Sequence, residues 1–247
     1  MDVSFQLYSA NNFADWPKIF KTVAGLGYTQ VEGYGAIYED PQATRALLDE
    51  NGLQMPSGHF ALDLLSNDTD KAIAIATELG MQRIYCPWIA PADRSADSAD
   101  WKNLGERLEA IGTKVKAAGF AFGWHNHDFE FVKCTDGTMP MDMLLRSAPS
   151  IDWEADIAWI VRGKQDPLKW IEAYKDRITA VHVKDLAPEG ENQNEGGWAD
   201  LGHGTVDWRT ILAALRKNGV NLFVLEHDKP SDIDRFASRS IASFKAL

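Results

Sequence analysis

Short apolar runs alternate with amphipathic helical stretches from one end of this chain to the other. Such alternation is typical of a parallel sheet that is covered by helices. A helical stretch follows each of eight candidate strands, which are residues 3–9, 30–34, 54–60, 83–88, 121–127, 151–157, 178–185 and 222–228. The clearest helical stretch is 101–118, where one buried face is marked by Leu104, Leu108, Ile111 and Val115.

A weak internal repeat places a glycine between a helical stretch and the next strand, in GLGYTQVEGY, ENGLQMPSGH, ELGMQRIYCP, AAGFAFGWHN and KNGVNLFVLE. Glycine accepts the left-handed conformation that ends a helix. No Pro-rich or Ser-rich linker divides the chain, so we expect residues 1–247 to form one domain. Eight strand–helix units in one domain predict an α/β fold, the (β/α)8 TIM barrel, with any active site at the C-terminal strand ends.

The alternative fold is an open, doubly wound sheet. Neither G-x-G-x-x-G nor G-x-x-x-x-G-K-[ST] follows a candidate strand, so nucleotide-binding loops are not expected. The connections 129–140 and 187–205 are long for a barrel, and the second contains five glycines. Long connections are usually functional, so we expect 187–205 to be a mobile lid, with a tolerated surface insertion as the alternative.

Composition narrows the possible partners. The chain has 25 Lys and Arg against 36 Asp and Glu, a formal charge of −11 that repels phosphate backbones and anionic lipids. Its two cysteines, Cys86 and Cys134, form no C-x-x-C pair, which favours a reducing compartment. The N-terminus lacks signal-peptide features and no window approaches ~18 consecutive apolar residues. We therefore expect a cytoplasmic protein without nucleic-acid or membrane partners, and leave a homo-oligomer open.

Side chains alternate along a strand, which predicts the groups that face the barrel axis. In the last four strands we expect the aromatic and aliphatic side chains to face the helices. The polar side chains near the strand ends then face the barrel axis. Four successive strands thus each deliver an ionisable group to the same end of the barrel: His125, Asp156, His182 and Glu226.

Burying these four groups without a partner would be costly, and a divalent metal ion is an efficient partner. Two imidazoles and two carboxylates suit Mn²⁺, Co²⁺, Zn²⁺ or Fe²⁺ better than Ca²⁺ or Mg²⁺. We therefore expect one divalent ion to be bound by these residues. The alternative is that each is an ordinary hydrogen-bonded interior group.

Seven segments carry a family resemblance: VEGYG, SGHFAL, GWHNHDFEF, ADIAW, VHVKD, GHGTVDW and VLEHD. Together they resemble the sugar phosphate isomerase/epimerase family, whose xylose isomerase-like TIM barrel is also called the AP-endonuclease family 2 fold. The resemblance spans essentially the whole chain. It implies one divalent cation held by Glu, Asp, His and Glu from strands five to eight.

Carried over by motif, these ligand positions are His125, where Glu is usual, Asp156, His182 and Glu226. In two-carboxylate epimerases of the family, the glutamates of strands five and eight act as paired proton acceptor and donor. His125 removes one member of that pair, and Glu130 is a candidate to replace it as acid/base or ligand. The candidate catalytic residues are accordingly Glu226, Glu130, Lys184 and Glu154.

Further inward residues are candidates for substrate contact, because sugar sites combine hydrogen-bonding side chains with aromatic platforms. They are Glu32, His59, Trp88, His127 and Lys184. Core packing is the alternative for Trp88. Lys184 would polarise a carbonyl or stabilise an oxyanion, and an ion pair with Glu154 or Asp156 is its alternative.

The resemblance predicts a metal-dependent isomerase or epimerase that acts on a keto-sugar or keto-glycoside through an enediolate. Expulsion of a leaving group from the same intermediate would instead give a lyase or hydrolase on 3-keto-glycosides. A non-catalytic sugar-binding barrel is a further alternative. An apurinic-site endonuclease needs three zinc ions and a basic surface, which six histidines and a charge of −11 disfavour.

Overall fold

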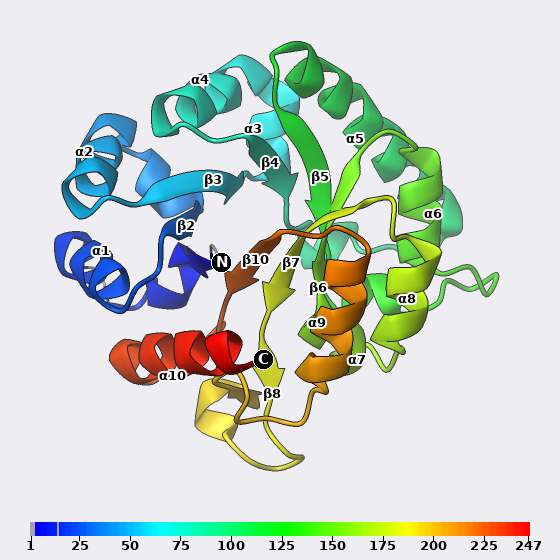
Figure 1. The fold of residues 1–247 in the computed structure, drawn as a ribbon. Coiled ribbons are helices and arrows are strands. Elements are labelled where there is room, and N and C mark those ends of the chain that lie inside the picture. The colour runs from blue at the N-terminus through cyan, green and yellow to red at the C-terminus, as the bar shows by residue number, and fades with distance from the viewer. Residues whose placement is uncertain (1–2, 14) are drawn as a thin grey trace.

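The computed structural model describes residues 3–13 and 15–247, and in them eight parallel strands close into a barrel (Figure 1). The predicted TIM barrel is therefore confirmed, and the open sheet is wrong. Around the barrel the strands follow the order β1 (Ser4–Gln6), β10 (Leu222–Leu225), β7 (Ile178–Val183), β6 (Asp152–Asp156), β5 (Ala121–His125), β4 (Arg83–Cys86), β3 (Gln54–His59) and β2 (Gln30–Gly33).

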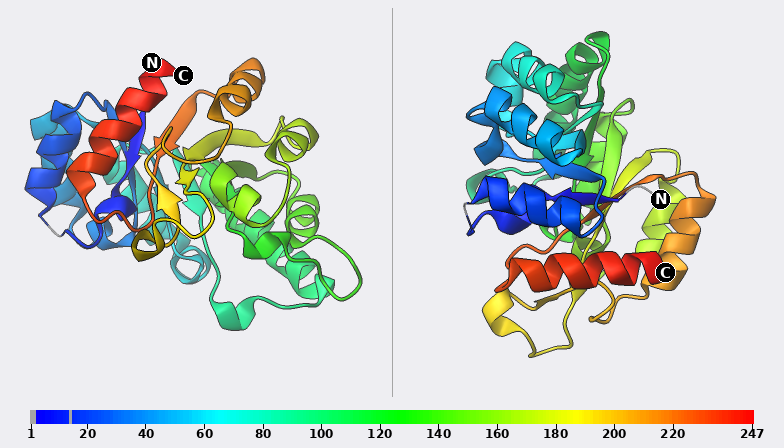
Figure 2. Two further views of the ribbon diagram at one scale, coloured as in Figure 1. Left: turned by 90° about the horizontal axis from the view of Figure 1, so that it is seen from below. Right: turned by 60° about the vertical axis from the view of Figure 1, so that its left-hand side comes forward.

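Helices surround the strands on the outside (Figure 2). They are α1 (Trp16–Gly25), α2 (Pro41–Asn51), α3 (Leu62–Asn67), α4 (Thr69–Leu79), α5 (Ser98–Ala117), α6 (Pro140–Ser147), α7 (Ile157–Arg162), α8 (Pro167–Ala173), α9 (Trp208–Lys217) and α10 (Ile233–Ala246). Among the described residues, no helix has the length and apolarity needed to cross a bilayer.

The sequence marks the ends of many of these helices. Aspartate side chains accept a backbone N–H at the first turns of α1, α2, α4, α5 and α7–α10. Each of these bonds gives a partner to an N–H that has none within its helix. The five glycines of the internal repeat all have positive φ, as predicted: Gly27, Gly52, Gly80, Gly119 and Gly219. Each one lets the chain leave a helix and turn toward the next strand.

The main core lies between the strands and the helices. The outward-facing residues of the last four barrel strands belong to it, as the alternation predicted, including Phe122, Trp124, Trp153 and Phe223. A smaller apolar cluster fills the barrel interior: Tyr85, Ala180, Leu222 and Val224. The inward-facing polar residues lie beyond this cluster, at the C-terminal strand ends. Cys86 and Cys134 are both free, buried thiols.

Several strands end earlier than expected. The barrel strand predicted over 178–185 stops at Val183, and β8 (Asp185–Leu186) leaves the barrel to pair antiparallel with β9 (Trp198–Ala199). The connection 187–205 is thus partly ordered by a short hairpin, which no periodic pattern in the sequence predicts. The Asp185 carboxylate accepts N–H groups from the far side of this connection, at Gly202, Gly204 and Val206.

Helix α10 also contacts this connection (Figure 2). The Arg235 guanidinium lies 2.9 Å from Glu195 and 2.9 Å from Asp200, and both carboxylates are largely buried. The segment therefore lies against the barrel through defined ion pairs. Whether it opens as a lid stays a prediction.

Candidate functional site

A cavity of about 970 Å³ opens at the C-terminal ends of the barrel strands. Its aromatic wall consists of Tyr8, Tyr34, Trp88, Trp159 and Trp198. Among the ionisable residues that line it are His59, His125, His127, Glu226, Asp228 and Arg162. A second layer of charged groups lies beneath this surface with no exposure: Glu32, Glu154, Asp156, His182 and Lys184.

Asp156, His182 and Glu226 form the first group that can bind a metal ion, and their donor atoms all lie within 4.8 Å of one another. Asp156 Oδ1 accepts the Trp159 N–H at the start of α7, which leaves Oδ2 on the side of His182. His182 Nδ1 is 2.9 Å from Glu226 Oε2. Its other nitrogen, Nε2, is 2.6 Å from Glu32 Oε1, a carboxylate partner typical of a metal-binding imidazole.

Lys184 lies between the carboxylates of this group. Its Nζ is 2.9 Å from Asp156 Oδ2, 2.7 Å from Glu226 Oε2 and 2.8 Å from Asp228 Oδ1. Burial lowers the pKa of Lys184, but the three carboxylates outweigh it and raise the pKa above its ordinary value. The ion pair with Asp156, the alternative role predicted for Lys184, is therefore present, and Lys184 is not among the residues that line the cavity.

Two indole rings complete the surroundings of Lys184. The ammonium lies 5.3 Å from the centroid of Trp159 and 4.8 Å from that of Trp198. These two rings meet edge to face at 4.7 Å, and Arg162 lies 3.5 Å from the centroid of Trp198. Neither tryptophan is among the site residues predicted from the sequence. The position of Trp159, three residues after Asp156, is the one signal that points to it.

Glu226 is the member of this group that reaches the cavity wall. Burial alone would raise the pKa of Glu226, but the charges of Lys184 and His182 lower it well below its ordinary range. Glu226 is therefore a carboxylate at neutral pH. The donor set of two carboxylates and one imidazole fits a divalent transition-metal ion. The carboxylate oxygens of Asp156 and Glu226 would then contact both this ion and the Lys184 ammonium.

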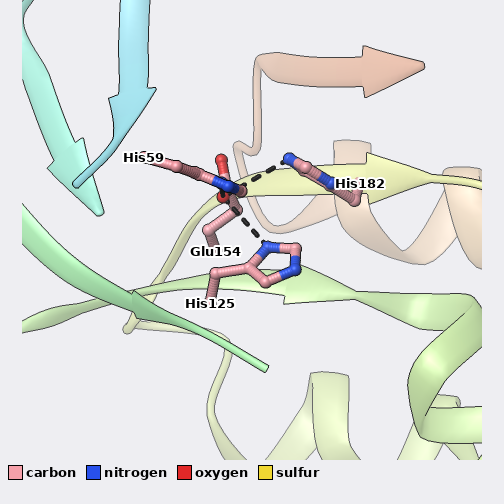
Figure 3. A group of neighbouring side chains, drawn as sticks. All are labelled: His59, His125, Glu154 and His182. Carbon is pink, nitrogen blue, oxygen red and sulfur yellow. Dashed lines mark hydrogen bonds and ion pairs between the residues drawn. The ribbon is translucent and has the colours of Figure 1, made fainter. Parts of the chain in front are cut away.

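A second group consists of His59, His125, Glu154 and His182 (Figure 3). Glu154 Oε2 is 2.6 Å from His59 Nε2, 3.1 Å from His125 Nδ1 and 3.4 Å from His182 Nε2. The structure thus does not bring His125 into one group with Asp156 and Glu226. The strand register explains this, because His125 lies opposite Glu154 on β6, whereas Asp156 lies opposite His182 on β7.

Glu32 and Glu154 are two carboxylates buried in contact with the same imidazole. His59 Nε2 lies 3.2 Å from Glu32 and 2.6 Å from Glu154. Burial, together with the charge of Glu32, raises the pKa of Glu154 to about 7. Burial also opposes ionisation of Glu32, but the charges of His59 and His182 lower its pKa to about 2.

Glu130 lies away from both groups. Its carboxylate accepts the Trp124 indole N–H at 2.9 Å and the His127 backbone N–H at 3.0 Å, and burial raises its pKa to about 8. Trp124 faces the helices, so Glu130 is held on the outer side of β5. The structure therefore does not bring Glu130 together with either group, and its role as acid/base or ligand stays a prediction.

The expected substrate contacts divide into two layers. His59, Trp88 and His127 line the cavity, and Trp88 is 44% exposed. Glu32 lies beneath them, where it is held by Gln6 and Ser57. Burial lowers the pKa of His127 to about 3, so its ring is neutral.

The sequence matches the model of a known family, and the fold matches solved structures. A sequence model of the xylose isomerase-like TIM barrel family matches residues 20–247. An inosose dehydratase of Lacticaseibacillus casei is 22% identical over 138 residues, which cover 51% of this chain and 46% of that protein. The chain thus spans about half the length of that relative.

A second inosose dehydratase, from Klebsiella pneumoniae, is 21% identical over 242 residues, which cover 85% of this chain and 80% of that protein. Among solved structures, a sugar phosphate isomerase/epimerase from Parabacteroides distasonis superposes with a TM-score of 0.81 at 22% identity. That match covers 100% of this chain and 94% of the other. At this identity the structural likeness shows the fold.

Proposed function

Since the chain belongs to the xylose isomerase-like TIM barrel family, we propose that it is an enzyme that removes a proton beside a carbonyl group of a small carbohydrate. The observation that carries this proposal is the position of Glu226, a carboxylate on the wall of a large, aromatic-lined cavity and beside Asp156 and His182. A carboxylate in that place can accept a proton from a carbon acidified by a neighbouring carbonyl.

Asp156, His182 and Glu226 are the residues that would hold a divalent cation in this enzyme. An imidazole among the donors favours Mn²⁺, Co²⁺, Zn²⁺ or Fe²⁺ over Mg²⁺. When bound, such an ion would supply Lewis-acid polarisation of the substrate carbonyl. Lys184, which shares the oxygens of Asp156 and Glu226, would keep Asp228 as its partner.

Loss of a β-hydroxyl or β-alkoxy group is the outcome that we favour, and the enzyme is then a lyase. Burial keeps the pKa of His125 well below its ordinary value, so the strand-five position offers a neutral ring rather than a second carboxylate. The relatives named inosose dehydratase support this outcome.

Return of the proton to another face or carbon is the alternative, and it would make the enzyme an isomerase or epimerase. Both outcomes begin with the same proton abstraction. The identity of the product therefore distinguishes them.

The test is to incubate the purified chain and Mn²⁺ or Co²⁺ in D₂O with an inosose, keto-sugars and 3-keto-glycosides. Mass spectrometry and NMR would detect loss of water or an aglycone for a lyase, and deuterium incorporation with retained composition for an isomerase. Absence of both products and of C–H exchange across the panel would overturn the proposal. Thermal stabilisation by a sugar without turnover would indicate a binding protein.

A further inference from the structure

Three imidazole rings and one carboxylate converge in the barrel interior, beside the group of Asp156, His182 and Glu226 (Figure 3). His59 comes from β3, His125 from β5 and Glu154 from β6. All three donors therefore lie on strands of the closed barrel, and no loop movement is needed to bring them together.

His182 belongs more closely to the first group than to this one. Its Nδ1 lies 2.9 Å from Glu226 and its Nε2 lies 2.6 Å from Glu32, while Glu154 is 3.4 Å away. With both ring nitrogens committed, His182 leaves a set of three donors: His59 Nε2, His125 Nδ1 and Glu154 Oε2.

Charge gives a second, independent reason to place a cation here. Glu32 and Glu154 have no exposure and contact the same nitrogen of His59. Two carboxylates so placed repel each other, because the barrel interior solvates charge poorly. A proton or a metal ion bound beside them would relieve this repulsion. In addition, Glu154 Oε1 accepts no hydrogen bond from any described residue.

We propose that His59, His125 and Glu154 bind a second divalent transition-metal ion, distinct from the ion assigned to Asp156, His182 and Glu226. Two imidazoles and one carboxylate are a donor set that Zn²⁺ and Fe²⁺ accept in sites that keep open positions. His59 and His125 line the cavity, whereas Glu154 lies beneath it. The open side of the ion therefore faces the cavity, where a substrate oxygen can reach it.

Metal stoichiometry tests this proposal without any assay of activity. Chain stripped with a chelator would be dialysed against Co²⁺ or Zn²⁺, and bound metal counted by plasma mass spectrometry. We expect two ions per chain in the wild type and one in His59→Asn or Glu154→Gln. Asp156→Asn should also retain one ion, because it removes the other site. Combining Glu154→Gln with Asp156→Asn should remove both.

Controls separate the two sites from surface binding and from unfolding. His203→Asn removes an exposed histidine outside both groups and should leave two ions. Far-UV circular dichroism would check that each variant is folded. If a variant does not fold, the wild type alone can be titrated with Co²⁺ to saturation. The visible absorption of the bound Co²⁺ then shows whether one or two metal sites are occupied.

One ion in the saturated wild type would overturn the second site. A single ion lost in both His59→Asn and Asp156→Asn would do the same, because it would indicate one shared site. If that single ion is lost only in Asp156→Asn, the metal assignment of the proposed function stands while this inference fails. Absence of any bound ion would contradict both.

Discussion

Glu226 contacts the buried charges and also faces the cavity, so a single substitution can separate its two roles. Glu226→Gln keeps one oxygen ligand and the shape but cannot accept a proton. We expect the rate to stay lower by roughly 10²–10⁴-fold even at saturating metal, the usual contribution of a general base. Rates measured across a metal titration would show this, with the exposed Glu191→Gln as control. Near-wild-type turnover at saturation would eliminate Glu226 as the base.

Lys184 contacts three carboxylates, so the effect of removing it should depend on bound metal. Lys184→Met should lower the free energy of unfolding of metal-free protein by about 3–5 kcal/mol, because buried carboxylates lose their partner. Added Mn²⁺ or Co²⁺ should then stabilise the variant more than the wild type, since the ion no longer shares its oxygens with an ammonium. Urea unfolding with and without metal measures both effects. Equal stabilisation of the two proteins would contradict the shared site.

Glu130 has a structural role that pH should reveal. Glu130→Gln places an amide NH₂ opposite an N–H donor, so at pH 5 we expect a loss of about 1–3 kcal/mol in unfolding free energy. The folded-state pKa of Glu130, about 8, lies above its ordinary value, so the wild type alone loses stability as pH rises toward 8. The difference between the two proteins should therefore shrink with rising pH. A gap that widens in urea titrations would refute this.

Among the secondary-structure elements, the strands show what the sequence could and could not predict. Alternation correctly identified the inward-facing residues of β5, β6 and β7, because side-chain parity is a local property. The partner of each inward residue depends on the register between strands. Nothing in the local pattern shows that His125 lies opposite Glu154, so the sequence placed it with Asp156 instead.

Strand ends were overestimated for a related reason. The predicted strands run to Asp228 and His127, whereas the hydrogen-bonded ladder stops at Leu225 and His125. At these points the chain turns to present side chains such as His127 and Asp228 to the cavity. Periodicity cannot detect that change, because the turn is stabilised by contacts with other segments.

The connection 187–205 provides a prediction about a whole element. Arg235→Gln should raise the amide exchange rates of this segment, because it removes the ion pairs with Glu195 and Asp200. Hydrogen-exchange mass spectrometry would measure this, with Arg239→Gln as control, since Arg239 is half exposed and lies 3.5 Å from Asp200. If the segment closes over substrate, a bound sugar should slow the exchange again. Unchanged exchange in Arg235→Gln would show that these ion pairs do not hold the connection 187–205 in place.

For the molecule as a whole, the formal charge of −11 disfavours binding to nucleic acid. Phosphate backbones are repelled at low ionic strength, where attraction to a basic surface would be strongest. We expect no retention of abasic duplex DNA in gel-shift experiments at low salt, with or without Zn²⁺. A shifted band that weakens as salt rises would contradict this.

The aromatic wall of the cavity also gives the molecule an optical property. Indole emission shifts and quenches when nearby charges move or water leaves, and Trp159 and Trp198 lie against both Lys184 and Arg162. Trp88 adds a ring that is open to solvent. Entry of a ligand or a quenching ion such as Co²⁺ would therefore register directly in the ultraviolet fluorescence of the unlabelled chain. Occupancy of the site can be followed in real time before any substrate has been identified.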